Sequence, residues 1–186
     1  MRRLKLITVA LCLLAFLLGA ASAQNKSLYD RLGGKDAIKA VVDEFVTRVA
    51  ADTRINQKFA KSNIDRFKFE LVEQICAGTG GPCKYKGLDM KTAHKNMGVT
   101  EGEFNALVEN LVAALDKFNV GETEKKELLG ILGPMKSQIV EVNSQETGTP
   151  LPAKFKPAPP LKEGKTKADK GKGDKDKSEK KKRGMY

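Results

Sequence analysis

The residue with the clearest chemical potential is His94, the single histidine of the 186-residue chain. It lies in the stretch 90–98, where Met90, Ala93 and Met97 recur at the spacing of one helical face. His94 joins that face, so we expect its imidazole to point inward. An inward imidazole can pack in the core, satisfied by a backbone carbonyl, or it can ligate a metal, and this stretch alone does not decide between the two.

Cys76 and Cys83 are the two cysteines outside the N-terminal segment. Two thiols and one distant imidazole are too few ligands for a CxxC-type metal site, and the CxxCH motif of covalent haem is absent. An even pair of cysteines in an exported protein favours a disulfide, which is worth about 2.5 kcal/mol for so short a loop. Two buried free thiols are the alternative.

Helices must position these side chains, because the apolar residues of 24–150 follow a helical period and show no sustained alternation. Glycines at 33–34, 78, 80–81 and 98 separate the helices, and residues 100–103 form a capping box that opens a long one. We expect four substantial helices and two short ones, hence an all-α fold. The four apolar faces are Ile38, Val41, Val42, Phe45, Val46 and Val49; Ile64, Phe67, Leu71 and Ile75; Phe104, Leu107, Val108, Leu111, Leu115 and Phe118; and Leu128, Leu129, Leu132, Met135, Ile139 and Val142, with Pro134 as a kink.

The two ends of the chain differ in composition from its middle. Residues 1–23 combine three basic residues, an apolar run and Ala-Ser-Ala before Gln24, which predicts a cleaved secretory signal and an exported protein, periplasmic or extracellular. Residues 151–186 hold 13 basic and five acidic side chains and almost nothing apolar, so we expect a disordered Lys-rich tail. The domain between them, 24–150, carries 18 basic and 18 acidic side chains.

The net charge of +11 therefore resides in the flanking segments and not in the domain. No nucleic-acid-binding motif accompanies the basic tail, so we expect no specific nucleic acid partner. The tail either keeps the protein in solution or binds an anionic surface.

Six short motifs follow one another along the domain. They are LYDRLGG at 28–34, Phe59, GGP at 80–82, YKG at 85–87, MKTAH at 90–94 and GV at 98–99. Together, over about residues 27–143, they resemble the truncated haemoglobins, most closely group 1. The resemblance implies a two-over-two helical sandwich around non-covalent haem b, with His94 as the proximal ligand of the iron.

The same resemblance assigns neighbours to the haem. It implies that Phe59 packs on the porphyrin face, that Tyr85 lies near a propionate, and that Met90 contacts the haem one helical turn before His94. For the apolar members, plain core packing is the alternative. The expected lining of the distal side is Phe45, Val46, Phe67 and Leu71.

Two positions depart from the group 1 pattern. Members of the group commonly carry a tyrosine on the first long helix and a glutamine on the distal helix, and both hydrogen-bond bound oxygen. Aligned without gaps, these positions are Val46 and Leu71, and neither side chain donates a hydrogen bond. Gln74 is the nearest polar candidate on the distal helix, and we expect its amide to face solvent.

These features favour one function and leave two alternatives. The favoured function is reversible binding of a diatomic gas, O2, CO or NO, at pentacoordinate haem iron, a role that is not enzymatic. The enzymatic alternative is nitric oxide dioxygenation or peroxide detoxification on the same haem, which the lack of distal donors disfavours. A non-haem adhesion domain with His94 in its core is the other alternative. The existence of a reductase partner stays open.

Overall fold

The computed structural model describes residues 26–157. The predicted secretory signal lies outside these residues, as does most of the Lys-rich tail. Apart from one isolated β-bridge between Thr100 and Val142, the regular structure of the described residues is helical, which confirms the all-α prediction. The elements are α2 (Leu28–Arg31), α3 (Gly34–Ala51), η2 (Asn56–Phe59), α4 (Ile64–Gly78), α5 (Met90–His94), α6 (Glu101–Lys117), α7 (Glu122–Leu132), η3 (Gly133–Met135) and α8 (Lys136–Ile139).

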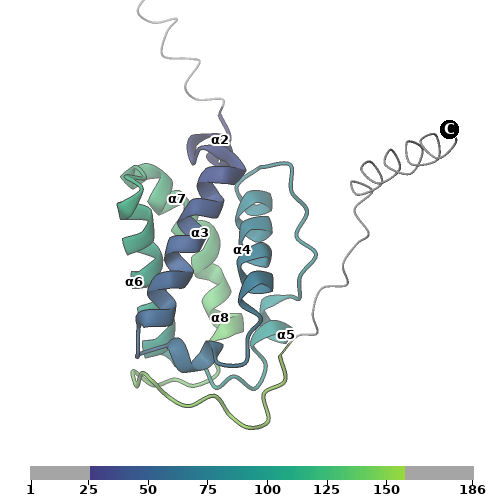
Figure 1. Cartoon of the computed structure of the whole chain (residues 1–186), viewed down its shortest axis with the longest axis vertical. Helices are drawn as coiled ribbons and strands as arrows, with labels where there is room; N and C mark the ends of the chain where they lie inside the picture. Colours follow the sequence, from purple (N-terminus) through teal and green to yellow (C-terminus); the bar gives the residue numbers. More distant parts are fainter. Residues whose placement is uncertain (1–25, 158–186) are drawn as a thin grey trace, which may run out of the picture.

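Helix α3 lies at the centre of this arrangement and packs against both α4 and α6. In Figure 1, α4 and α6 flank α3, and α7 and α8 lie behind it. The short helix α5 lies at the lower end of α4, and a long loop connects the two. This loop and α5 carry the candidate chemistry, while the long helices form the frame.

The entry into α3 depends on a glycine pair in the left-handed region. Gly33 has φ 90° and Gly34 has φ 79°, a conformation that side chains on Cβ disfavour. A Cβ on Gly33 would also stand only 2.9 Å from the Cβ of Ala37. The hydroxyl of Tyr29 accepts a hydrogen bond from the backbone N–H of Lys35 at 3.1 Å. Gly33 and Gly34, together with Tyr29, therefore set the angle between α2 and α3.

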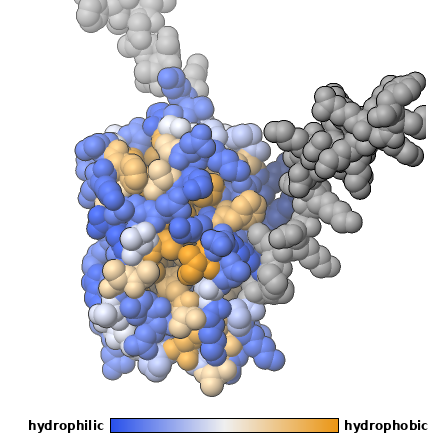
Figure 2. All heavy atoms as spheres, viewed as in Figure 1, coloured by the Kyte–Doolittle hydropathy of each residue, from blue (hydrophilic) through white to orange (hydrophobic). Residues whose placement is uncertain are grey.

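Two hydrophobic clusters form the interior. The larger one joins α3, α4, α6 and α7, and includes Val42, Ala114 and Leu128, each at most 2% exposed. The smaller one lies around the turn that follows His94 and consists of Met97, Val99, Phe104, Ile139 and Phe155. Figure 2 shows apolar residues reaching the surface near the middle of a largely hydrophilic face. No helix among residues 26–157 is long and apolar enough to cross a membrane.

Cys76, in the last turn of α4, is bonded to Cys83 in the following loop, with 5.7 Å between the two Cα atoms. The chain between them turns back tightly against the helix. A Cβ on Gly81 would stand 2.7 Å from the Cys76 sulfur and 2.5 Å from Cδ2 of Tyr29, so this position requires glycine. The disulfide ties the end of α4 to the loop that leads to α5.

The helix that carries His94 is shorter than its apolar spacing predicted. It ends at His94, and the buried Met97 lies beyond it in a turn where Asn96 has φ 63°. The Glu141 carboxylate accepts hydrogen bonds from the backbone N–H groups of Asn96 and Gly98, at 2.7 and 2.6 Å. A partner distant in sequence therefore satisfies the donors that a continued helix would have used.

The last predicted helix is also interrupted. Pro134 lies in the 3-10 turn η3, between α7 and α8, because proline has no N–H for the helical ladder. Helix α8 ends at Ile139, so Val142, which the periodicity placed on the apolar face, is extended and 43% exposed. The packed chain then continues past residue 150, and Phe155 is only 7% exposed.

Candidate functional site

A cavity of about 380 Å³ lies between α4, α5 and the core helices. Seven of the eight residues that the sequence predicted around a haem line it: Phe45, Phe59, Phe67, Leu71, Tyr85, Met90 and His94. Val46 is the exception. It is 6% exposed and packs in the larger core cluster, whereas Val42 and Phe45 on the same helix line the cavity. Val46 therefore does not line the cavity, which lies on a neighbouring face of α3, and its place on the distal side of a haem stays a prediction.

His94 is held with one ring nitrogen fixed and the other available. Its Nδ1 lies 2.8 Å from the carbonyl oxygen of Met90, one turn earlier on α5. Since a carbonyl only accepts, the proton must lie on Nδ1, and Nε2 keeps its lone pair. Nε2 makes no hydrogen bond within the described chain, and the ring lines the cavity. Burial lowers the pKa of His94, which keeps the imidazole neutral and able to ligate.

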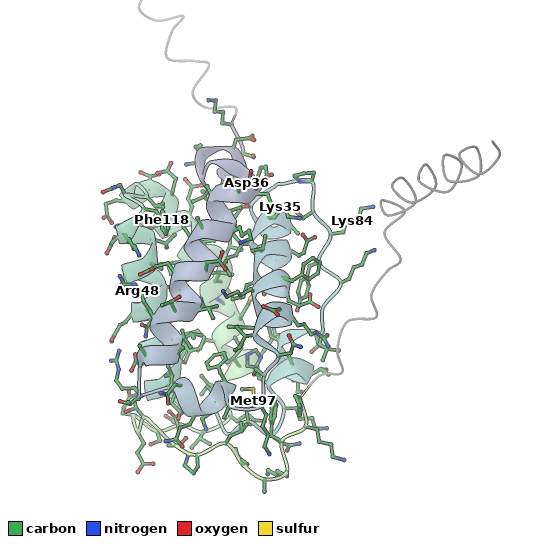
Figure 3. The ribbon with its side chains drawn as sticks, in the orientation of Figure 1. Lys35, Asp36, Arg48, Lys84, Met97 and Phe118 are labelled. Atoms are coloured by element: carbon green, nitrogen blue, oxygen red, sulfur yellow. A yellow bond between two sulfur atoms is a disulfide. The ribbon has the colours of Figure 1, made fainter. Side chains whose placement is uncertain are left out.

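Short elements place His94 in this position. The side chain of Asp89 caps α5 by accepting a hydrogen bond from Thr92 N–H at 2.9 Å. After the helix, the backbone turns through Asn96 and Gly98 into the capping box of α6, where Thr100 and Glu103 bond each other's backbone as predicted. Figure 3 labels Met97, in this turn, near the lower end of the molecule.

One wall of the cavity is aromatic and aliphatic. The rings of Phe59 and Phe67 are 5.0 Å apart at an interplanar angle of 46°, and Leu71 lies one turn further along α4. Leu107, Val108 and Leu111 of α6 complete the apolar lining on another side. A flat apolar group would therefore be enclosed by hydrocarbon over most of its area.

Gln74 lines the cavity instead of facing solvent, so that expectation is wrong. Its amide Nε2 lies 3.2 Å from the sulfur of Met135 and 3.8 Å from that of Met90. Thioether sulfur is a weak acceptor, so these contacts leave much of the donor capacity of the amide unused. Helical spacing alone could not predict that Gln74 lines the cavity, because the amide is held there by contacts with the sulfur atoms of Met90 and Met135, which lie on other elements.

One edge of the cavity carries charge. Arg66 and Glu70, both on α4, line it together with Tyr85 from the loop. Nη1 of Arg66 is buried and has no hydrogen-bond partner among residues 26–157, and its Nη2 lies 3.7 Å from Glu70, too far for a hydrogen bond. The Tyr85 hydroxyl donates to the carbonyl of Leu88 at 2.6 Å, and burial raises its pKa. An unpaired, buried guanidinium N–H is a ready partner for an anionic group.

These features fit haem. A haem needs an apolar slot, one inward imidazole and a polar edge for its two carboxylates. The cavity supplies the slot, His94 supplies a lone pair, and Arg66 supplies an unused donor. The negative charge of Glu70 would repel a second haem carboxylate at the same edge. The distance between Glu70 and Arg66 is too long for a hydrogen bond, so Arg66 can pair with a haem carboxylate in place of Glu70.

Comparison with solved structures identifies the class of fold. A truncated hemoglobin from Tetrahymena pyriformis, in the Fe(III) form, superposes with a TM-score of 0.60 at 30% identity, over 62% of this chain and 98% of the other. The 2/2 hemoglobin from Synechococcus sp. PCC 7002, in the cyanomet state with covalently attached heme, gives a TM-score of 0.60 at 29% identity, over 63% of this chain and all of the other. The helical arrangement is that of a 2/2 globin, as predicted.

Sequence comparison gives the family. Residues 27–141 match the model of the bacterial-like globins, so the chain belongs to that family. A group 1 truncated hemoglobin of Mycolicibacterium paratuberculosis is 36% identical over 117 residues, which is 63% of this chain and 86% of the relative. A group 1 truncated hemoglobin of Synechocystis is 33% identical over 111 residues, 58% of this chain and 90% of the relative.

The cavity also has lining residues that the sequence did not assign to it. Val42, Leu107, Val108, Leu111 and Met135 lie on the predicted apolar faces, so periodicity had marked them as buried without showing what they bury against. Phe155 and Pro157 line the cavity as well. Both stand in the segment whose composition predicted disorder, and no pattern in the sequence distinguished them.

Proposed function

We propose that this protein binds haem b non-covalently and uses it to bind a diatomic gas, O2, CO or NO, reversibly, with His94 as the proximal ligand. The observation that carries the proposal is the unpartnered Nε2 of His94 in a cavity with largely apolar walls. Family membership and the names of the relatives, which are hemoglobins, support it. Haem iron, when bound, supplies the centre at which a diatomic gas binds and leaves.

The residues of the chain have three tasks in this function. His94 is oriented by its hydrogen bond to Met90 and kept neutral by burial, so it presents a lone pair at neutral pH. Phe59, Phe67 and Leu71 exclude water from the opposite side. The Arg66 guanidinium offers its unused N–H to a carboxylate at the edge of the cavity. Non-covalent binding is favoured because the two cysteines of the described residues are bonded to each other.

We further propose that the protein acts outside the cytoplasm. The support is the signal-like sequence of residues 1–23 and the Cys76–Cys83 disulfide, a bond that persists in oxidising compartments. The Lys-rich segment 151–186, with a net charge of +8, is suited to anionic surfaces. An unidentified reductase would be needed to keep the haem ferrous if the gas is oxygen.

The experiment is to purify the mature chain, add hemin, and record absorption spectra in the oxidised form, the reduced form and the reduced form with CO. The proposal expects stoichiometric binding and the spectrum of a histidine-ligated haem that takes up CO. If hemin binds without saturation and CO leaves the spectrum unchanged, the proposal is wrong. Catalytic consumption of NO or peroxide by the loaded protein would favour the enzymatic alternative.

A further inference from the structure

The segment that follows α8, residues 140–157, closes one side of the cavity. We refer to it as the strap. Most of it lies beyond residue 141, where the match to the globin family ends. In Figure 1 it is the yellow-green chain that loops around the lower end of the bundle and reaches α5. We propose that the strap is part of the haem site of this protein and that Phe155, at its end, is a haem-retaining residue on the His94 side; this rests on the proposed function.

The first part of the strap is bonded to the start of α6. Backbone N–H groups of Glu141 and Val142 donate to the carbonyl of Val99, at 2.8 and 3.1 Å. A few residues on, Gly102 N–H donates to the carbonyl of Ser144 at 3.1 Å. The approach is close, since a Cβ on Gly102 would stand 2.3 Å from the carbonyl oxygen of Gln145. These contacts fix the direction of the strap as it leaves α8.

A buried ion pair holds the middle of the strap. The backbone N–H and hydroxyl of Thr149 both donate to Oε1 of Glu103, at 2.9 and 2.7 Å. The other carboxylate oxygen of Glu103 lies 3.4 Å from the ammonium of Lys58, and the two side chains are 2% and 4% exposed. Removing one member of a buried, hydrogen-bonded ion pair leaves an uncompensated charge, so Glu103 and Lys58 resist separation. Thr149 is bonded to this fixed carboxylate, and this anchors the middle of the strap.

The Lys58 ammonium joins the strap to the turn behind His94. It donates to the carbonyls of Met97 and Gly98, both at 3.0 Å, and to that of Pro150 in the strap at 3.4 Å. Lys58 directly precedes Phe59, which lines the cavity. One buried cation therefore connects the lining of the cavity, the turn after His94 and the strap.

The end of the strap is apolar and packed. Phe155 is 7% exposed and shares a cluster with Met97, Phe104 and Ile139, and Met90 packs against the same cluster. Both Phe155 and Pro157 line the cavity. Since Met90 and Met97 bracket His94 in the sequence, this end of the strap covers the side of the cavity to which His94 belongs. Its contacts are with the same side chains that support the proximal ligand.

A bound haem would lose this cover when Phe155 is truncated. Each Å² of apolar area that Phe155 buries lowers the free energy of the complex by tens of cal/mol. A tenfold change in rate corresponds to a free-energy change of about 1.4 kcal/mol. We therefore expect Phe155→Ala to release haem about tenfold faster than wild type or more. Thr149→Val removes only the hydroxyl that donates to Glu103 and no lining atom, so it tests the anchoring of the strap separately, with an expected increase of about threefold.

The experiment measures transfer of ferric haem from the full-length protein to an excess of apomyoglobin. The matched control is Leu128→Ala, which truncates a residue 2% exposed in the larger cluster and not in the cavity lining. It should lower the free energy of unfolding as much as Phe155→Ala does, and change the rate of haem loss less than twofold. Phe155→Leu, which keeps an apolar side chain, should lie between wild type and Phe155→Ala.

The inference is overturned if Phe155→Ala and Thr149→Val both lose haem at the wild-type rate. It is also overturned if Leu128→Ala accelerates loss as much as Phe155→Ala, since the effect then follows stability alone. If Phe155→Ala does not fold, the comparison of Phe155→Leu and Thr149→Val with wild type decides in the same way. A wild-type protein that takes up no hemin contradicts the proposed function itself, an outcome distinct from either of these.

Discussion

The apolar lining around Leu71 predicts fast oxygen release, and Leu71→Gln is the substitution that tests it. Leu71 lines the cavity, whereas Val46, the other position where group 1 members carry a donor, packs in the core. Dioxygen bound at haem carries partial negative charge on its outer atom, and a hydrogen-bond donor in an enclosed pocket stabilises it; CO gains much less. The wild-type protein should therefore release oxygen quickly and prefer CO.

The size of the effect follows from the energy of one hydrogen bond. A net contribution of about 0.5–1.5 kcal/mol, and more where the acceptor is charged, corresponds to a factor of about two to somewhat over ten in rate. Leu71→Gln supplies one amide donor in a side chain of similar size. Oxygen release should slow by about tenfold, and CO release by less than threefold.

Stopped-flow mixing of the oxygenated protein with CO measures the oxygen dissociation rate, and mixing of the CO form with excess NO measures the CO dissociation rate. Leu71→Met is the matched control, because it keeps an apolar side chain and should release oxygen as wild type does. If wild type already releases oxygen slowly, an existing donor reaches the gas. Gln74, which lines the cavity and whose amide contacts only thioether sulfur, is the first candidate, and Gln74→Leu would then speed release.

Three further predictions concern the rest of the chain. Intact mass before and after reduction and alkylation should show the Cys76–Cys83 disulfide in exported protein, and two free thiols there would contradict it. The Arg54 guanidinium, hydrogen-bonded to Asp52, lowers the pKa of Asp52 to about 2, so Asp52→Asn should reduce the free energy of unfolding by about 1–2 kcal/mol at pH 7. Because the folded pKa is depressed, that contribution is present above about pH 4 and is lost as the pH falls toward 2, which urea unfolding at pH 7 and pH 3 measures. Deleting 158–186 should abolish retention on anionic vesicles at low salt, and equal retention without it would make the segment a solubiliser only.

The long helices could be predicted from the sequence because each buries one face. Apolar spacing placed Phe45 and Leu71 correctly, and turn chemistry placed the capping box that opens α6. These signals are local: a helical period and a cap depend on residues within one or two turns. The resemblance to a family then added what spacing cannot, namely that the cluster around His94 lines a cavity.

What the sequence missed depends on contacts between distant segments. Helix α5 stops at His94 because the Glu141 carboxylate takes the N–H groups of the next turn. Gln74 turns inward toward the sulfur of Met135 on another element. Phe155 is buried although its segment is Lys-rich, because the buried Glu103 holds the strap through Thr149. None of these partners lies within a helical turn of the residue it affects.

The central claim is that His94 is the proximal ligand, and haem binding by His94→Gly with and without imidazole tests it most directly. The variant removes the imidazole and leaves room for a free one, and no other histidine exists in the chain to replace it. Hemin titration of the variant should give weak binding with an altered Soret band, and millimolar imidazole should restore the wild-type spectrum. A wild-type Soret band and wild-type affinity in His94→Gly without imidazole would contradict the claim.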